Sequence, residues 1–133
     1  MTPAPIQWPA VKALAAAAAL LCGAAAPAQG LPPLKVGLML PATGTYAALG
    51  TAIENGFRLH VAEQGGKLGG REITFFKVDD ESDPAKATDN VNKLIKRDGV
   101  DVVVGSVHSG VALAMARAVK ASRTLLIVPN AGA

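Results

Sequence analysis

The chain has 133 residues, of which 50% are hydrophobic, 17% are charged and 4% are aromatic, and its formal net charge is +3. This composition excludes an intrinsically disordered chain, and the length allows one domain. All ten acidic residues and all but one of the thirteen basic residues lie beyond residue 28. That part of the chain is therefore close to neutral, which argues against a surface dedicated to nucleic acid.

The N-terminal segment has the features of a secretory signal peptide. A single Lys12 precedes an alanine- and leucine-rich run from Ala13 to Ala26, and Ala26-Pro27-Ala28 offers a small-residue cleavage site. The run is shorter than the roughly 20 apolar residues that a membrane-spanning helix needs. We therefore predict that residues 1–28 are a signal peptide, cleaved near Ala28.

Cys22 leaves a second possibility open, because a cysteine after an apolar run can be the lipid-modified residue of a bacterial lipoprotein. Leu21 stands where that signal favours a small residue, so the match is poor. If Cys22 is removed with the signal peptide, the mature chain has no cysteine and no disulfide.

Strand and helix patterns alternate from residue 34 onward. The apolar run 34–40 predicts a buried strand, and 71–80 predicts a second strand that ends in acidic residues. Residues at helical spacing predict a helix between them, which stops at Gly65-Gly66. We expect the inner face of this helix to consist of Leu49, Ile53, Gly56, Phe57 and His60.

Asp83-Pro84 predicts the start of a second helix, since an aspartate accepts the first amide hydrogens and proline has none to lose. This helix ends at Gly99. Its inner face is expected to be Ala87, Val91, Leu94 and Ile95, and its outer face Lys86, Asn90, Lys93 and Arg97. A third strand (100–105), a third helix (110–121) and a fourth strand (124–130) follow.

This alternation predicts an α/β fold, a doubly wound parallel sheet with helices on both faces. The expected strand order is 2-1-3-4. Right-handed crossovers place the loop after each strand on the same edge, and ligands of such sheets bind where the strand order reverses.

The crevice at that edge is expected between PATGTYA (41–47) and GSVHSG (105–110), two loops rich in small residues and hydroxyls. The second loop leads into a helix whose free amide hydrogens can bind an anion. An equally good interpretation is that its glycines and serines make a tight turn, with Ser109 capping the helix.

Enzymatic motifs do not fit these loops. Gly44 and Gly50 have the wrong spacing for a P-loop, Val107 stands where a nucleophile elbow needs glycine, and no dinucleotide fingerprint is present, so no cofactor is implied. We interpret the acidic residues 79–83 as a solvated loop and a helix cap rather than a metal site. His60 fits the inner face of its helix, and His108 is a lone loop imidazole.

Three quoted segments carry a family resemblance: KVGLMLPATGTYAALG, then GGKLGGREITFFKVDDESDPAKATDNVNKLIKRDGVDVVVGSVHSG, then LLIVPNAGA. They resemble the first lobe of type I periplasmic solute-binding proteins of ABC importers, in the branched-chain amino acid (leucine-binding protein) group. The resemblance covers 34–133. It implies a two-lobed, non-enzymatic receptor in the periplasm that closes on a small carboxylate and delivers it to a membrane permease.

The resemblance also implies the site. The loop after the third strand would grip the carboxylate through Ser109, with Ser106, His108 and the backbone of Gly110 beside it. The loop after the fourth strand would contribute Asn130 and Ala131. The first loop offers weaker candidates in Thr43, Gly44 and Tyr46.

The loop after the fourth strand also bears on the ligand. The family often has a hydroxyl near Gly132 for the polar head of an amino acid, and this sequence has none there. The PNAGA and HSG variants resemble the branch of the family that takes aromatic or other carboxylic acids, while a branched-chain or other amino acid stays open as the solute.

Members of this family are longer, so residues 29–133 are expected to be an incomplete N-terminal lobe. An interrupted lobe leaves a sheet edge and apolar surface uncovered, which predicts a marginally stable product. Two alternatives stay open: a small secreted serine hydrolase that uses Ser106 or Ser109 with His108, and the ligand-sensing lobe of a receptor.

Overall fold

A computed structural model describes residues 30–132. The predicted signal peptide therefore lies outside the described residues. Within the described range, no helix is both long enough and apolar enough to cross a membrane. The elements follow one another as β1 (Leu34–Leu40), α2 (Ala47–Glu63), β2 (Lys67–Leu68), β3 (Arg71–Asp79), α3 (Pro84–Asn92), η1 (Lys93–Arg97), β4 (Val102–Val104), α4 (Ser109–Ser122) and β5 (Leu125–Ile127).

The strands form one sheet in the order β2-β3-β1-β4-β5. β3, β1, β4 and β5 are parallel neighbours, which confirms the predicted doubly wound sheet and the order 2-1-3-4 of its four predicted strands. β2 was not predicted. It pairs antiparallel with the start of β3 through Gly69-Gly70, and both of these glycines have the positive φ that a two-residue hairpin turn requires.

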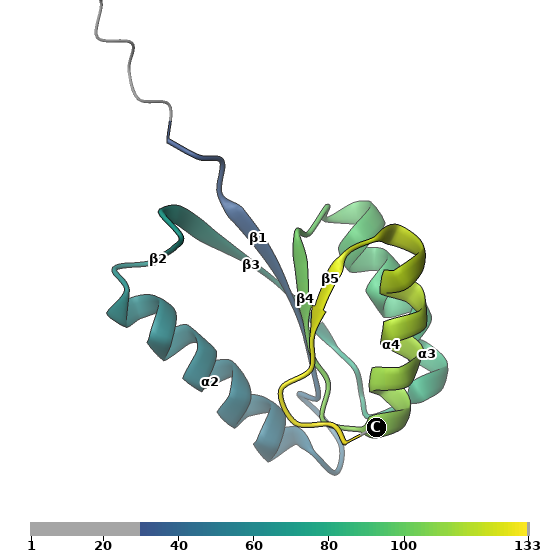
Figure 1. Ribbon diagram of the computed structural model, residues 1–133. Coiled ribbons are helices and arrows are strands. Elements are labelled where there is room, and N and C mark those ends of the chain that lie inside the picture. The colour runs from purple at the N-terminus through teal and green to yellow at the C-terminus, as the bar shows by residue number, and fades with distance from the viewer. Residues whose placement is uncertain (1–29, 133) are drawn as a thin grey trace, which may run out of the picture.

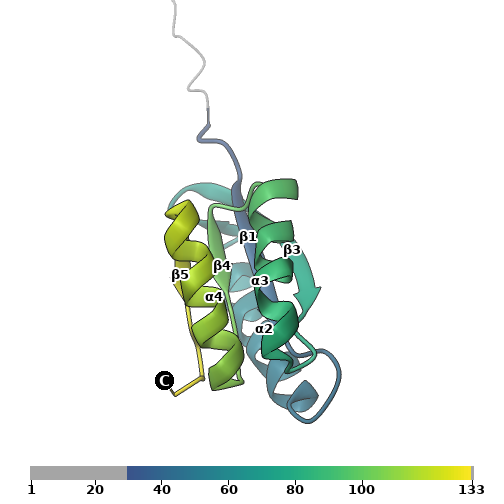
Figure 2. The same ribbon diagram turned by 90° about the vertical axis from the view of Figure 1, so that its right-hand side faces the viewer.

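Helices cover both faces of the sheet, as predicted (Figure 1). α2 lies on one face, while α3 and α4 lie side by side on the other (Figures 1 and 2). Because side chains alternate along a strand, β1 supplies Met39 to the face of α3 and α4, and Val36 and Leu38 to the face of α2. Burial on both faces explains why 34–40 is almost continuously apolar.

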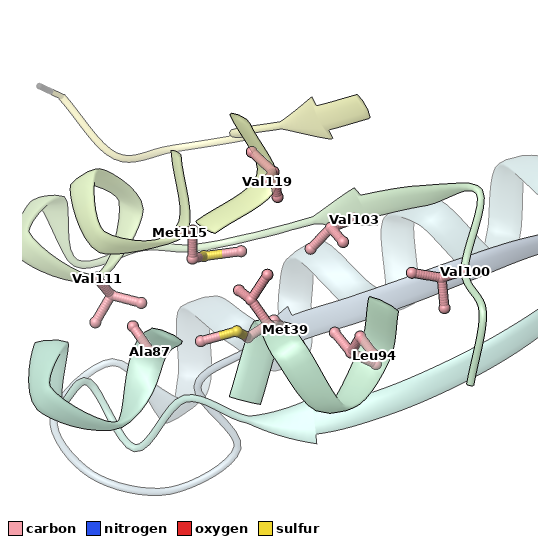
Figure 3. Packing of buried hydrophobic residues seen from close by; sticks show 9 residues of the cluster. Met39, Ala87, Leu94, Val100, Val103, Val111, Met115 and Val119 are labelled. Atoms are coloured by element: carbon pink, nitrogen blue, oxygen red, sulfur yellow. The ribbon is translucent and has the colours of Figure 1, made fainter. Parts of the chain in front are cut away.

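The larger cluster of buried residues lies between the sheet and the α3–α4 pair (Figure 3). Met39 and Met115 fill its centre, and both are fully buried. Val103 contributes from β4 and Val111 from the first turn of α4. The remaining members are Ala87, Val91, Leu94, Val100 and Val119. This cluster fixes α4 against the sheet and so sets where its N-terminus lies.

The buried stripe of α2 differs from the predicted one. Gly50 and Val61 are its buried residues, with Phe57 packed against the sheet between them. His60 and Gly56 are exposed and Leu49 is 46% exposed, so the prediction that these three residues lie on the inner face was wrong. The contact runs through Gly50 because the helix backbone approaches the end of β1 there too closely for a side chain.

Asn90 also lies on a different side than predicted. It is 7% exposed, and its side-chain amide donates to the carbonyl oxygen of Asp79 at 3.2 Å and accepts from Lys93 at 3.1 Å. α3 therefore buries a polar residue that ties it to the end of β3. By contrast, Asp83 caps α3 as predicted, accepting the backbone N–H of Ala85 at 2.9 Å with Pro84 as the first helical residue.

β5 forms one edge of the described sheet. Its side chains Leu125 and Ile127 are 62% and 47% exposed. The edge strand therefore leaves apolar side chains exposed on one face of the sheet.

Candidate functional site

The carboxyl ends of the four parallel strands meet at one edge of the sheet, at the bottom of Figure 1. Loops 41–46, 80–83, 105–108 and 128–132 leave β1, β3, β4 and β5 at this edge. α4 also begins there. The strand order reverses between β1 and β4, and ligands of open parallel sheets bind at such a reversal.

The loop after β1 is held by Asp79 at the end of β3. One oxygen of Asp79 accepts the backbone N–H groups of Ala42 and Glu81, each at 2.9 Å, and the other accepts the hydroxyl of Thr43 at 2.7 Å. Burial raises the pKa of Asp79, but the hydrogen bonds from Thr43, Ala42 and Glu81 outweigh it and lower the pKa below its usual value. The hydroxyl proton of Thr43 is thus directed to Asp79, while Gly44 makes the exposed turn with a φ of 79°.

The loop after β4 places Ser106 inside the protein. Ser106 is 0% exposed, and its hydroxyl donates to the carboxylate of Asp80 at 2.5 Å. Asp80 is also 0% exposed, and its other oxygen accepts the N–H of Ser82 at 2.8 Å. The interpretation of 79–83 as a solvated loop was therefore wrong for Asp80, whose carboxylate is needed inside to accept hydrogen bonds from two loops.

The N-cap of α4 is His108, not Ser109. Its Nδ1 accepts the backbone N–H of Gly110 at 3.1 Å and of Val111 at 3.4 Å. The imidazole thus occupies two of the amide hydrogens that were expected to be free for an anion. Gly110 is required beside it, because a Cβ there would lie 2.9 Å from both the His108 ring and the Pro84 ring.

Ser109 connects α4 to the loop after β5. Its hydroxyl donates to the carbonyl oxygen of Gly132 at 2.6 Å, so Asn130 and Ala131 belong to a loop held against the start of this helix. Tyr46, in the loop after β1, also lies near the start of α4, because its ring centroid is 6.2 Å from that of His108. The loops after β1, β4 and β5 therefore lie close together, and of the predicted contacts only Ser106 is fully buried.

The hydrolase alternative requires a serine hydroxyl paired with the imidazole of His108. Ser106 instead donates to Asp80, Ser109 donates to Gly132, and Nδ1 of His108 caps the helix. No such Ser–His pair is formed in the part of the chain that the structure describes. Nor do three or more His, Cys, Asp or Glu side chains converge within residues 30–132 in a way that could hold a metal ion.

Sequence reasoning missed Asp79, Asp80 and Asn90, the polar residues that organise this edge. A signal was present in 79–83, because acidic residues that end a strand and precede a turn commonly accept the N–H groups of that turn.

Comparison with known proteins identifies the family. The family model described as periplasmic binding protein matches residues 33–133. The Leu/Ile/Val-binding protein BraC3 of Rhizobium johnstonii is 34% identical over 103 residues, which are 75% of this chain and 28% of that protein.

Solved structures give the same result. A solute-binding protein of an ABC transporter from R. palustris, in complex with benzoate, is 58% identical with a TM-score of 0.74 and matches over 76% of this chain and 28% of its own. LivJ of Streptococcus pneumoniae, in complex with isoleucine, is 30% identical with a TM-score of 0.70, over 76% of this chain and 30% of its own. The chain thus spans less than a third of the length of these relatives. It belongs to the periplasmic binding protein family, and the relatives that it matches include Leu/Ile/Val-binding proteins and solute-binding proteins of ABC transporters, as the resemblance in its sequence predicted.

Proposed function

We propose that the protein carrying this chain is the substrate-binding component of an ABC importer, and that residues 34–132 are the part of its first lobe that holds the carboxylate of a small organic acid. The observation that carries this proposal is the 58% identity to the R. palustris protein in complex with benzoate. The relative in complex with isoleucine is 30% identical over a similar share of the chain. We therefore rank aromatic carboxylates ahead of branched-chain amino acids.

Hydrogen-bond donors for a carboxylate are available at the start of α4. Because Nδ1 of His108 accepts two backbone N–H groups, a neutral imidazole carries its proton on Nε2. That atom can donate to a carboxylate oxygen. Ser109 offers its backbone N–H and a hydroxyl that now donates to Gly132. In this proposal Asn130, Ala131, Thr43 and Gly44 line the crevice, and the backbone of Gly110 supports it.

Tyr46 supports an aromatic ligand in particular. Its ring is half-buried and lies beside the imidazole of His108. Aromatic side chains favour offset or edge-to-face packing with another ring, worth about 0.5–1.5 kcal/mol beyond the area buried. A benzoate ring could thus pack near Tyr46 while its carboxylate meets Ser109 and His108.

One lobe alone is too weak a binder. Two or three hydrogen bonds to a charged group contribute roughly 1.5–3 kcal/mol each. Association costs about 4 kcal/mol or more, whereas micromolar affinity requires about 8 kcal/mol net. Useful affinity therefore depends on a second surface that closes over the ligand and excludes water.

The location and partner are part of the same proposal. Residues 1–28 would direct export to the periplasm, and an ABC permease in the inner membrane would receive the solute. Cell fractionation that finds the protein in the cytoplasm with residues 1–28 retained would contradict the location.

Binding is tested by titrating the complete protein that carries this chain with benzoate, isoleucine and benzamide in a calorimeter. Benzamide has the shape of benzoate without its charge, so we expect binding of benzoate and at least about tenfold weaker binding of benzamide. Ser109→Ala should weaken benzoate binding. Ser122→Ala, at the other end of α4, should not, since its hydroxyl bonds only within residues 119–124. Failure of both carboxylates to bind would refute the proposal.

A further inference from the structure

A buried carboxylate at the end of β3 has no cation beside it. Asp80 is 0% exposed, and no ion pair involves it among the residues that the structure describes. Burying a carboxylate away from water is costly unless hydrogen bonds replace the lost solvation. Asp80 obtains two, from the hydroxyl of Ser106 at 2.5 Å and from the N–H of Ser82 at 2.8 Å.

The bond between Asp80 and Ser106 joins two strands that are not neighbours. Asp80 follows β3 and Ser106 follows β4, and β1 lies between these strands in the sheet. The two side chains therefore meet across the end of β1. The hydrogen bond therefore connects loop 80–83 to loop 105–108, which lie on either side of loop 41–46.

The same hydrogen-bond chain continues to the start of α4. The Oγ atom of Ser106 accepts the backbone N–H of His108 at 3.3 Å, and the imidazole of His108 then caps α4. A series of hydrogen bonds therefore runs from Asp80 through Ser106 to His108, and Ser109 is the next residue. Asp80 is too deeply buried to touch a solute.

The loop that carries Asp80 is itself strained. Glu81 and Ser82 have φ values of 48° and 56°, a left-handed conformation that is unfavourable for residues other than glycine. Their N–H groups are accepted by the carboxylates of Asp79 and Asp80, which hold the loop in this shape. Strained backbone persists where the surrounding structure fixes it, and it concentrates at functional sites.

We infer that Asp80 is a positioning residue for ligand binding, which acts through Ser106 to set His108 and Ser109 in the crevice. This inference rests on the proposed function. A residue that only stabilised the fold would affect the melting temperature and leave the affinity of the folded protein unchanged. A positioning residue changes the affinity as well.

The test compares Asp80→Asn and Ser106→Ala with Val100→Ala in the complete protein, using benzoate and isoleucine as probes. Val100 is a core residue before the amino end of β4, away from the crevice. We expect the Kd of the bound probe to rise at least about tenfold in Asp80→Asn and Ser106→Ala. In Val100→Ala we expect a lower melting temperature with an unchanged Kd. The double variant should bind no more weakly than the weaker of the two single variants, because both substitutions act on the same contact between Asp80 and Ser106.

The outcomes separate this inference from the proposed function. If the unmodified protein binds neither probe, the proposed function fails, and the positioning role fails with it. If it binds, and Asp80→Asn and Ser106→Ala both keep a Kd within twofold of the unmodified protein, the positioning role alone is refuted. If Asp80→Asn does not fold, the Kd of Ser106→Ala alone tests the positioning role, since this variant removes only the hydroxyl that donates to Asp80.

Discussion

Two glycines of α2 provide a matched test of how this helix lies against the sheet. A Cβ on Gly50 would overlap the carbonyl oxygen of Pro41 and lie 2.9 Å from its carbonyl carbon, whereas ordinary contacts begin at 3.4 Å. A Cβ on Gly56 would meet nothing within 4 Å. Both residues lie inside the helix, so an alanine at either position gains the same helix propensity, about 0.8–1 kcal/mol.

The two substitutions should therefore have opposite effects. Gly56→Ala is expected to stabilise the protein by about 0.5–1 kcal/mol. At Gly50 the obstacle is the backbone of Pro41 just after β1, so α2 must move away, and overpacking of this kind costs about 1–3 kcal/mol. After the gain in helix propensity is subtracted, Gly50→Ala should destabilise by up to about 2 kcal/mol.

Thermal and urea denaturation followed by far-UV circular dichroism would measure both variants. Because Pro41 begins the loop that contains Thr43 and Tyr46, Gly50→Ala should also weaken benzoate binding, while Gly56→Ala should not. Equal stabilisation by the two alanines would show that α2 does not approach β1 as described, and would refute the reasoning.

Three further predictions concern the end of β3 and the loop that leads from it to α3. Asp83→Ala should lower the free energy of unfolding, measured in urea, by about 1 kcal/mol, because α3 loses its N-cap. The control Asp89→Ala changes an exposed residue and should alter the free energy by less than about 0.5 kcal/mol. Equal losses in the two variants would contradict the capping role of Asp83. Ser82→Gly should stabilise by about 1 kcal/mol, since it relieves a left-handed φ and removes a buried hydroxyl that has no partner among the described residues; a lower melting temperature would count against this. Burial raises the pKa of Asp79, but its hydrogen bonds, chiefly the one from Thr43, have the larger effect. The pKa of Asp79 therefore lies below the ordinary aspartate value of 3.8. Asp79 therefore stabilises the folded protein fully above pH 3.8, and this stabilisation is lost as the pH falls through the lowered pKa. The unfolding free energy of Asp79→Asn should consequently depend less on pH in acid than that of the unmodified protein. Parallel pH profiles of the two proteins would contradict this prediction.

The sequence was sufficient for the architecture because the architecture depends on apolar periodicity. The near-continuous runs of β1 and β4 predict strands buried on both faces, and their alternation with helices predicts a parallel sheet. Asp83-Pro84 was equally readable, since the N-cap interaction is made within three consecutive residues. β2 was missed because two residues are too few for a periodic pattern, although Gly69-Gly70 marks its turn.

The candidate site, too, could be predicted only in part from the sequence. The sequence alone determined that small and hydroxyl residues end the strands at one edge of a parallel sheet, because strand polarity and crossover handedness are local rules. Only the tertiary structure decided which way those side chains face. Ser106 and Asp80 turn inward to meet each other across β1, and His108 takes the cap expected of Ser109. A polar side chain goes to the donor or acceptor that folding brings within about 3 Å, and for Ser106 and Asp80 that partner lies 26 residues away along the chain.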